Sequence, residues 1–147
     1  MDQKFANEIV KDITQISSSI LKEIKLSIPE TDLYKRSIRL RKLFLELLNL
    51  VDEIKIEDPT FYKSVQQVLQ TNLTVVISRI LKYSVLISAR VFSDVHIEGT
   101  KFTEKIVIEN SGLGKKIFAT LNTDINLLKK DIHKSLTNII NTILNSK

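Results

Sequence analysis

The stretch from Phe5 to Ile24, FANEIVKDITQISSSILKEI, has the clearest periodicity in the chain. Its apolar residues step by 4, 4, 3, 4 and 4, at Phe5, Ile9, Ile13, Ile16, Ile20 and Ile24. Because an α-helix completes a turn in about 3.6 residues, this spacing places all of them on one helix face. The pattern predicts an amphipathic helix over residues 3–26, which ends before Pro29 because proline disfavours helix at the preceding residue.

Two more segments follow with helical spacing. Residues 32–55 carry a single apolar stripe, formed by Leu33, Leu40, Phe44, Leu47, Val51 and Ile54. The next segment, residues 59–92, follows Asp58 as a good N-cap and has Pro59 at its first position. It is apolar on more than one face, which is typical of a helix that is central in its bundle or packed against another subunit. Its many β-branched residues leave a strand as the alternative.

The last segment, residues 103–144, keeps helical steps of 3 and 4 from Leu113 to Ile143. Asn110, Gly112 and Gly114 interrupt it, so the pattern predicts a long last helix with a kink near Gly112–Gly114. The preceding stretch SDVHIEGT alternates, as does KFTEKIVIE after it. Residues 95–109 are therefore either a loop that leads into the helix or a hairpin.

Together these segments predict an all-α fold, an up-and-down antiparallel four-helix bundle in one domain over residues 1–147. We expect the core to include Ile13, Ile20, Phe44, Leu47, Val76, Ile80, Leu121 and Leu128. Arg79, Lys82 and Arg90 interrupt the most apolar stretch, which argues against a membrane span. The first residues, MDQKFANEIVKD, lack the apolar region of a signal peptide, so the sequence predicts a cytoplasmic protein.

The composition argues against several kinds of site. The chain has no cysteine, and its two histidines, His96 and His133, are far apart, so we expect no metal site. Three glycines cannot supply a glycine-rich phosphate loop, and no serine lies in a GxSxG turn. The sequence therefore predicts a protein without a cofactor that is not an enzyme.

The formal net charge of +5 favours a polyanionic partner. In residues 34–51, YKRSIRLRKLFLELLNLV, helical geometry places Lys35, Arg39 and Lys42 opposite the apolar stripe. Such ridges are usually solvated faces. If the second and last segments are adjacent, however, their ridges would merge into a strip suited to phosphate contacts. The candidate nucleic-acid-binding residues are Lys35, Arg36, Arg39, Arg41, Lys42, Lys115, Lys116, Lys129, Lys130 and Lys134.

One pair of residues suggests catalysis instead. Arg90 and His96 are separated by five residues, in RVFSDVH. This spacing resembles the arginine–histidine motif of HEPN-type ribonucleases, which are also helical bundles. The resemblance implies that Arg90 and His96 act on an RNA phosphate. The alternative is an arginine at a helix end and a histidine in a loop.

A second resemblance covers about half of the chain. It is carried by SIPETDLYKRSIRLRKLFLELLNLV, YKSVQQVLQTNLTVVISRILKYSVLI and GKKIFA. These stretches resemble the accessory variability determinant proteins of diversity-generating retroelements, which are bacterial four-helix bundles. Phe118 and Thr120 stand where that family tends to have a second glycine and a tryptophan.

The resemblance implies a non-enzymatic protein that forms a ring-like pentamer, binds nucleic acid through its basic exterior and works with a reverse transcriptase. The sequence thus favours a homo-oligomeric, nucleic-acid-binding bundle, with RNA preferred over DNA. The alternatives are the ribonuclease and a protein-binding helical module of a microbial surface or host-interaction protein.

Overall fold

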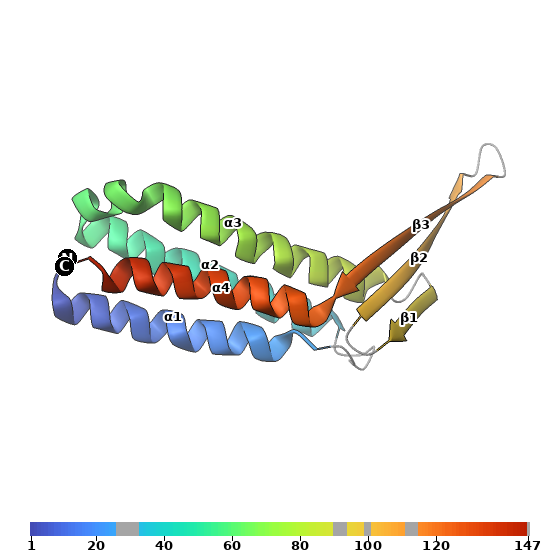
Figure 1. Ribbon diagram of the computed structural model, residues 1–147, viewed down its shortest axis with the longest axis horizontal. Helices are drawn as coiled ribbons and strands as arrows, with labels where there is room; N and C mark the ends of the chain where they lie inside the picture. The colour runs from blue at the N-terminus through green and yellow to red at the C-terminus, as the bar shows by residue number, and fades with distance from the viewer. Residues whose placement is uncertain (26–32, 90–93, 99–100, 111–114, 147) are drawn as a thin grey trace.

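The computed structural model describes residues 1–25, 33–89, 94–98, 101–110 and 115–146, with side chains described for 1–25, 35–84 and 124–146. Its elements in chain order are α1 (Gln3–Glu23), α2 (Leu33–Glu57), α3 (Pro59–Ala89), β1 (Asp94–Glu98), β2 (Lys101–Asn110), β3 (Lys115–Asp124) and α4 (Ile125–Leu144). The helices form a long bundle, and the strands extend from one end of it (Figure 1).

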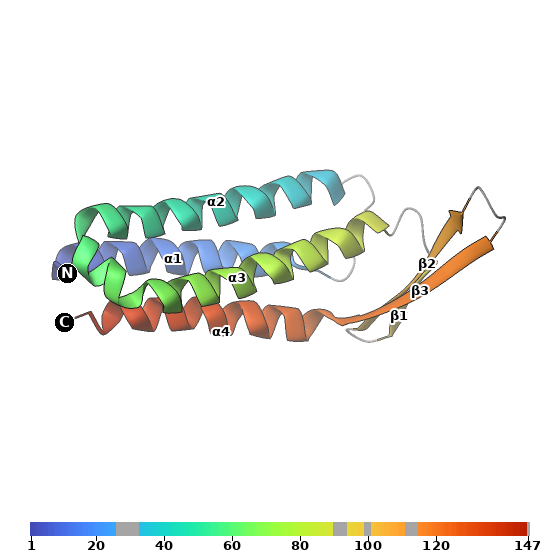
Figure 2. The same ribbon diagram turned by 90° about the horizontal axis from the view of Figure 1, so that it is seen from above.

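The helices run alternately up and down. α1 and α3 run toward the sheet, whereas α2 and α4 run away from it (Figure 1). α1 and α3 each pack against both α2 and α4, so α2 and α4 lie diagonally across the bundle (Figure 2). This arrangement confirms the up-and-down four-helix bundle.

Side-chain caps define where the helices begin. The backbone N–H of Phe61 donates to Asp58 Oδ1 at 3.1 Å, and Pro59 opens α3, as the sequence predicts. Asp124 caps α4 by accepting from the N–H groups of Asn126 at 3.0 Å and Leu127 at 3.4 Å. Each cap satisfies donors that have no partner within the first helical turn.

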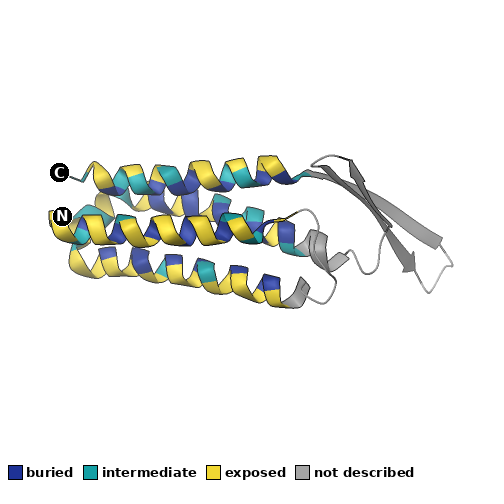
Figure 3. Ribbon diagram, turned by 90° about the horizontal axis from the view of Figure 1, so that it is seen from below, coloured by how far each residue is buried: buried dark blue, intermediate teal, exposed yellow. Residues whose placement is uncertain are grey.

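The core follows the predicted stripes. The buried positions of the four helices face inward, and exposed positions lie on the outside (Figure 3). Of the expected core residues, seven are buried: Ile13, Ile20, Phe44, Leu47, Val76, Ile80 and Leu128. The eighth, Leu121, lies in β3, where side chains are not described.

The strand alternative for residues 59–92 is wrong over the described part, because α3 is one continuous helix from Pro59 to Ala89. Two of its apolar side chains, Val68 and Leu81, remain exposed on the bundle surface. No helix among the described residues combines the length and the apolar character that crossing a membrane requires.

The prediction that the last helix begins near residue 103 is wrong. Residues 101–110 and 115–124 are antiparallel strands, and α4 begins only at Ile125. The hairpin alternative for 95–109 is confirmed, because β1 pairs with β2. The kink predicted near Gly112–Gly114 lies outside the described residues.

The misprediction has a physical cause. Ile117 and Leu121 are four residues apart, a spacing that fits one face of a helix and also the period of two of a strand. Ile106 and Ile108, two residues apart, fit only the strand period. Two alternating runs separated by SGLG are typical of a hairpin with a short glycine-containing loop.

The buried stripe of α2 should contribute strongly to stability. Leu47→Ala removes a side chain with 0% exposure from the centre of α2. We expect it to lower the free energy of unfolding by about 2–5 kcal/mol, because the site cannot collapse fully around the lost atoms. Leu45→Ala is the control, since Leu45 is 58% exposed on the same helix. Its effect should stay within about 0.5 kcal/mol in urea denaturation. Equal losses in both variants would contradict the described packing of α2.

Candidate nucleic-acid interface

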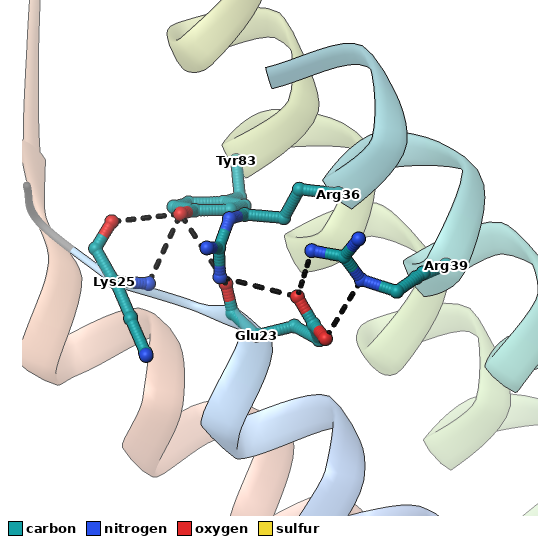
Figure 4. A network of polar contacts seen from close by, with 5 residues as sticks. All are labelled: Glu23, Lys25, Arg36, Arg39 and Tyr83. Carbon is teal, nitrogen blue, oxygen red and sulfur yellow. Dashed lines mark hydrogen bonds and ion pairs between the residues drawn. The ribbon is translucent and has the colours of Figure 1, made fainter. Parts of the chain in front are cut away.

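The candidate interface includes the end of α1. The last carbonyls of a helix have no partner within it. Here Arg36 of α2 donates from Nη1 to the carbonyl oxygen of Glu23 at 2.8 Å. Tyr83 of α3, which is fully buried, donates its hydroxyl to the carbonyl of Lys25 at 2.7 Å and accepts the N–H of Lys25 at 3.0 Å. Side chains from two other helices therefore fix the end of α1 (Figure 4).

The Glu23 carboxylate joins the same network. Arg36 Nη1 lies 3.1 Å from Glu23 Oε2, and Arg39 Nε lies 2.9 Å from Glu23 Oε1. The Arg36 side chain is only 8% exposed, whereas Glu23 and Arg39 are 21% and 43% exposed. We call these residues, together with Tyr83 and Lys25, the α1-end network. Charge-assisted hydrogen bonds of this kind are stronger than neutral ones, and the burial of Arg36 makes its partner necessary.

The network corrects part of the predicted ridge on α2. Arg36 is buried, so it does not lie on the outer surface as a candidate contact. Arg39 is on the outer surface, but its guanidinium is bound to Glu23. The remaining candidates on this helix, Lys35, Arg41 and Lys42, are exposed as expected.

The candidate basic residues of the predicted last helix lie in two elements, β3 and α4. Lys130 and Lys134 are exposed on α4, and Lys129 is half-buried there. Lys115 and Lys116 are the first residues of β3. Because α2 and α4 lie diagonally across the bundle, their ridges do not merge into one strip. The merged strip was predicted for adjacent second and last helices, and the two are not adjacent.

Instead, the structure separates charge along the bundle axis. We define the sheet-end half of the bundle as residues 14–25, 35–45, 75–84 and 124–134, which the helix directions bring to one end (Figure 1). Its basic residues are Lys22, Lys25, Lys35, Arg36, Arg39, Arg41, Lys42, Arg79, Lys82, Lys129, Lys130 and Lys134. Its acidic residues are Glu23, Asp124 and Asp131.

The opposite half of the described bundle has the reverse balance. Its acidic residues are Asp2, Glu8, Asp12, Glu46, Asp52, Glu53, Glu57 and Asp58, and its basic residues are Lys4, Lys11, Lys55 and Lys63. A signal of this separation was present in α2, whose first half is basic and whose second half is mainly acidic. It becomes a property of the surface only when the helices are known to alternate in direction.

The acidic residues of the sheet-end half are engaged in the structure. Glu23 binds Arg36 and Arg39, and Asp131 binds Arg79 Nε at 2.9 Å. Asp124 caps α4. Arginine suits such pairs because its planar group donates several hydrogen bonds in a fixed geometry. The acidic groups are thus held by arginines or by a helix end, while most lysines of this half point to solvent.

A shallow groove lies between α1 and α2, across the boundary between the two halves of the bundle. It has a volume of about 420 Å³ and is lined by Asp12, Gln15, Ile16, Ser19, Leu43, Glu46, Asn49 and Leu50. Its carboxylates do not favour an anionic ligand. Across the described residues, no three histidine, aspartate or glutamate side chains gather as they would around a metal ion.

The proposed catalytic pair is only partly located. His96 lies in β1, opposite Thr103 of β2, and not in a loop. Arg90 lies outside the described residues. Joint action of Arg90 and His96 on RNA therefore stays a prediction.

No family model, curated protein or solved structure matches the chain. The resemblance to the accessory variability determinant proteins consequently depends on the quoted stretches alone, and it stays a prediction.

The α1-end network yields a second prediction. Tyr83→Phe removes the hydroxyl and leaves the Lys25 backbone groups without that partner in a part-buried site. We expect the free energy of unfolding to fall by about 1–3 kcal/mol. Tyr62→Phe, at a half-buried tyrosine near the other end of α3, is the matched control and should change it by less than about 0.5 kcal/mol. Indistinguishable urea midpoints for the two variants would show that the network does not stabilise the fold.

Proposed function

We propose that the chain is a non-enzymatic bundle that binds nucleic acid, with RNA preferred, through the exposed basic residues of the sheet-end half. The observation that carries the proposal is the separation of charge along the bundle axis. A basic surface at one end attracts phosphates, and the acidic opposite half repels them. A polyanion would therefore approach the sheet end first.

The exposed basic side chains near the start of α2 form the preferred contact region. Lys35, Arg41 and Lys42 are exposed on α2. Lys22 and Lys25 are exposed near the end of α1, which Arg36 and Arg39 of α2 bind through Glu23. The α1-end network holds these two helix ends together, so the backbone positions that carry these charges are fixed before binding. Preorganised charges lose less conformational entropy when they bind.

The expected recognition is of backbone and not of base. Lysine contacts phosphate as a point charge and carries no sequence information by itself. The chain contains no tryptophan, and few aromatic residues are available for stacking on unpaired bases. We therefore propose binding with little sequence preference and a strong dependence on salt.

The biological role follows from the family resemblance. It suggests an oligomeric accessory factor of a reverse transcriptase that works in the cytoplasm. Lysine-rich phosphate contacts without base readout suit a factor that binds a template RNA of any sequence. A reverse-transcriptase gene beside the coding gene would support this role.

A charge-reversal experiment tests the binding surface. Lys35→Glu, Arg41→Glu and Lys42→Glu together should weaken binding to unrelated RNA sequences and leave the core intact. The slope of log affinity against log salt concentration should fall by about 1 for each true phosphate contact that is lost. Fluorescence anisotropy over a salt series measures both quantities, and circular dichroism checks the helices.

The matched control reverses the same number of charges in the opposite half. Lys4→Glu, Lys11→Glu and Lys63→Glu cause an equal change in net charge, and all three residues are exposed. This variant should keep most of the affinity and the full salt slope. If both variants lose affinity equally, only net charge matters. Unchanged binding in the sheet-end variant would refute the proposed surface.

The enzyme alternative has its own test. We expect the unmodified protein to leave RNA intact in a cleavage assay followed by gel electrophoresis. Cleavage that disappears in His96→Ala, with helical content unchanged, would instead favour the ribonuclease alternative with Arg90 and His96.

A further inference from the structure

The outer edge of β3 can accept another strand. The sheet order is β1-β2-β3, so within the described residues β3 has a strand neighbour on one side alone. β3 is 10 residues long, whereas strands most often have about 5–6. Its sequence, KKIFATLNTD, contains neither proline nor glycine. A long, regular edge strand presents a row of backbone donors and acceptors to any strand that approaches it.

The register of the sheet places opposite charges at the two ends of β3. Lys116 pairs with Glu109 near the tip of the hairpin, and Asp124 pairs with Lys101 beside the bundle. Residues directly opposite each other in an antiparallel pair share a face, and alternate residues along a strand share a face. Lys116, Thr120 and Asp124 therefore belong to the same face of the sheet.

We propose that a second copy of the chain pairs with this edge, with the two β3 strands antiparallel and Thr120 opposite the partner's Thr120 on a two-fold axis. An antiparallel pair of identical strands is related by an axis normal to the sheet, and such a rotation keeps each face on its own side. At the axis, a residue therefore lies opposite the same residue of the partner strand, and not opposite its sequence neighbour. An interface of this kind is isologous, so each contact occurs twice.

Charge complementarity selects Thr120 as the axis position. With the axis at Thr120, Lys116 lies opposite the partner's Asp124. The joined sheets then carry alternating charges along one line, from Glu109 through Lys116 to the partner's Asp124 and the partner's Lys101. Moving the axis to Ala119 would place Lys116 opposite the partner's Asn122 and remove this match. Opposite charges directly across a strand pair stabilise it, whereas like charges destabilise it.

The proposed pairing keeps the apolar set of the sheet continuous. Ile117, Ala119 and Leu121 alternate with Lys116, Phe118, Thr120 and Asn122, and in both copies they stay on one face of the joined sheet. Because the strands are antiparallel, the two bundles lie at opposite ends of that sheet. This proposal does not depend on nucleic-acid binding, and its two-fold assembly differs from the pentamer that the family resemblance implies.

The test uses the mass of the full chain in solution. Light scattering after size-exclusion chromatography should show a monomer–dimer equilibrium. The concentration series should extend to tens of micromolar, an order suited to moderate affinity. Thr120→Glu places a glutamate opposite Lys105 within the chain, and this pair of opposite charges favours the folded sheet. In the dimer the same glutamate lies opposite the partner's glutamate, and this pair of like charges disfavours association. We expect its dimer dissociation constant to rise about fivefold or more.

Two comparisons make the result specific. Thr103→Glu introduces the same charge on the central strand β2, opposite Asn122, and should leave the dimer unchanged. Thr120→Lys should weaken the dimer on its own, and mixing it with Thr120→Glu should restore it by pairing opposite charges at the axis. Circular dichroism confirms that each variant is folded.

The proposal is overturned if the unmodified protein is monomeric throughout, or if it forms an assembly larger than a dimer. It also fails if the Thr120→Glu variant dimerises with the same affinity as the Thr103→Glu variant, because the contact would then lie elsewhere. Failure of the mixed charge variants to restore the dimer would equally contradict the axis at Thr120.

Discussion

The end of α1 is the constraint on which the rest of the bundle depends. Its last carbonyls need donors in a part-buried place, and the donors come from Arg36 at the start of α2 and Tyr83 near the end of α3. One polar network therefore ties three helices together at the sheet end. The apolar stripes bury the core along the whole length, but non-directional packing alone leaves the relative positions of helix ends less well determined.

The same network shapes the charge of the surface. Glu23 holds two arginines, and Asp131 holds a third, Arg79. The acidic side chains of the sheet-end half are thus used to fix arginines between helices. What this end presents to solvent is mainly lysine, which is strongly hydrated and mobile. Structural ion pairs and an exposed basic surface therefore coexist in one region because arginine and lysine serve different purposes there.

α1, α2 and α4 could be predicted from the sequence because an apolar stripe with mixed steps of 3 and 4 fits only the helix period, whereas α3, apolar on more than one face, left a strand as an alternative. Residues 115–124 could not, since the step from Ile117 to Leu121 fits a helix and a strand equally, although the alternation at Ile106 and Ile108 already indicated a strand before them. The burial of Arg36 also escaped prediction. A helical wheel of residues 34–51 places Arg36 beside the ridge, but it contains no information about Glu23, which lies on another helix. In the same way, charge separation along the axis depends on helix direction, which only the three-dimensional arrangement supplies.

The central claim is that the sheet-end half of the bundle is the surface that meets nucleic acid. Titration of isotope-labelled protein with a short RNA duplex, followed by amide chemical shifts, tests it most directly, because every described helix reports separately. We expect the shifts to concentrate in residues 14–25 and 35–45 and to diminish as salt is added, while those of residues 1–13 and 46–58 stay unchanged. Shifts centred on 46–58, or none at RNA concentrations well above those of the protein, would contradict it.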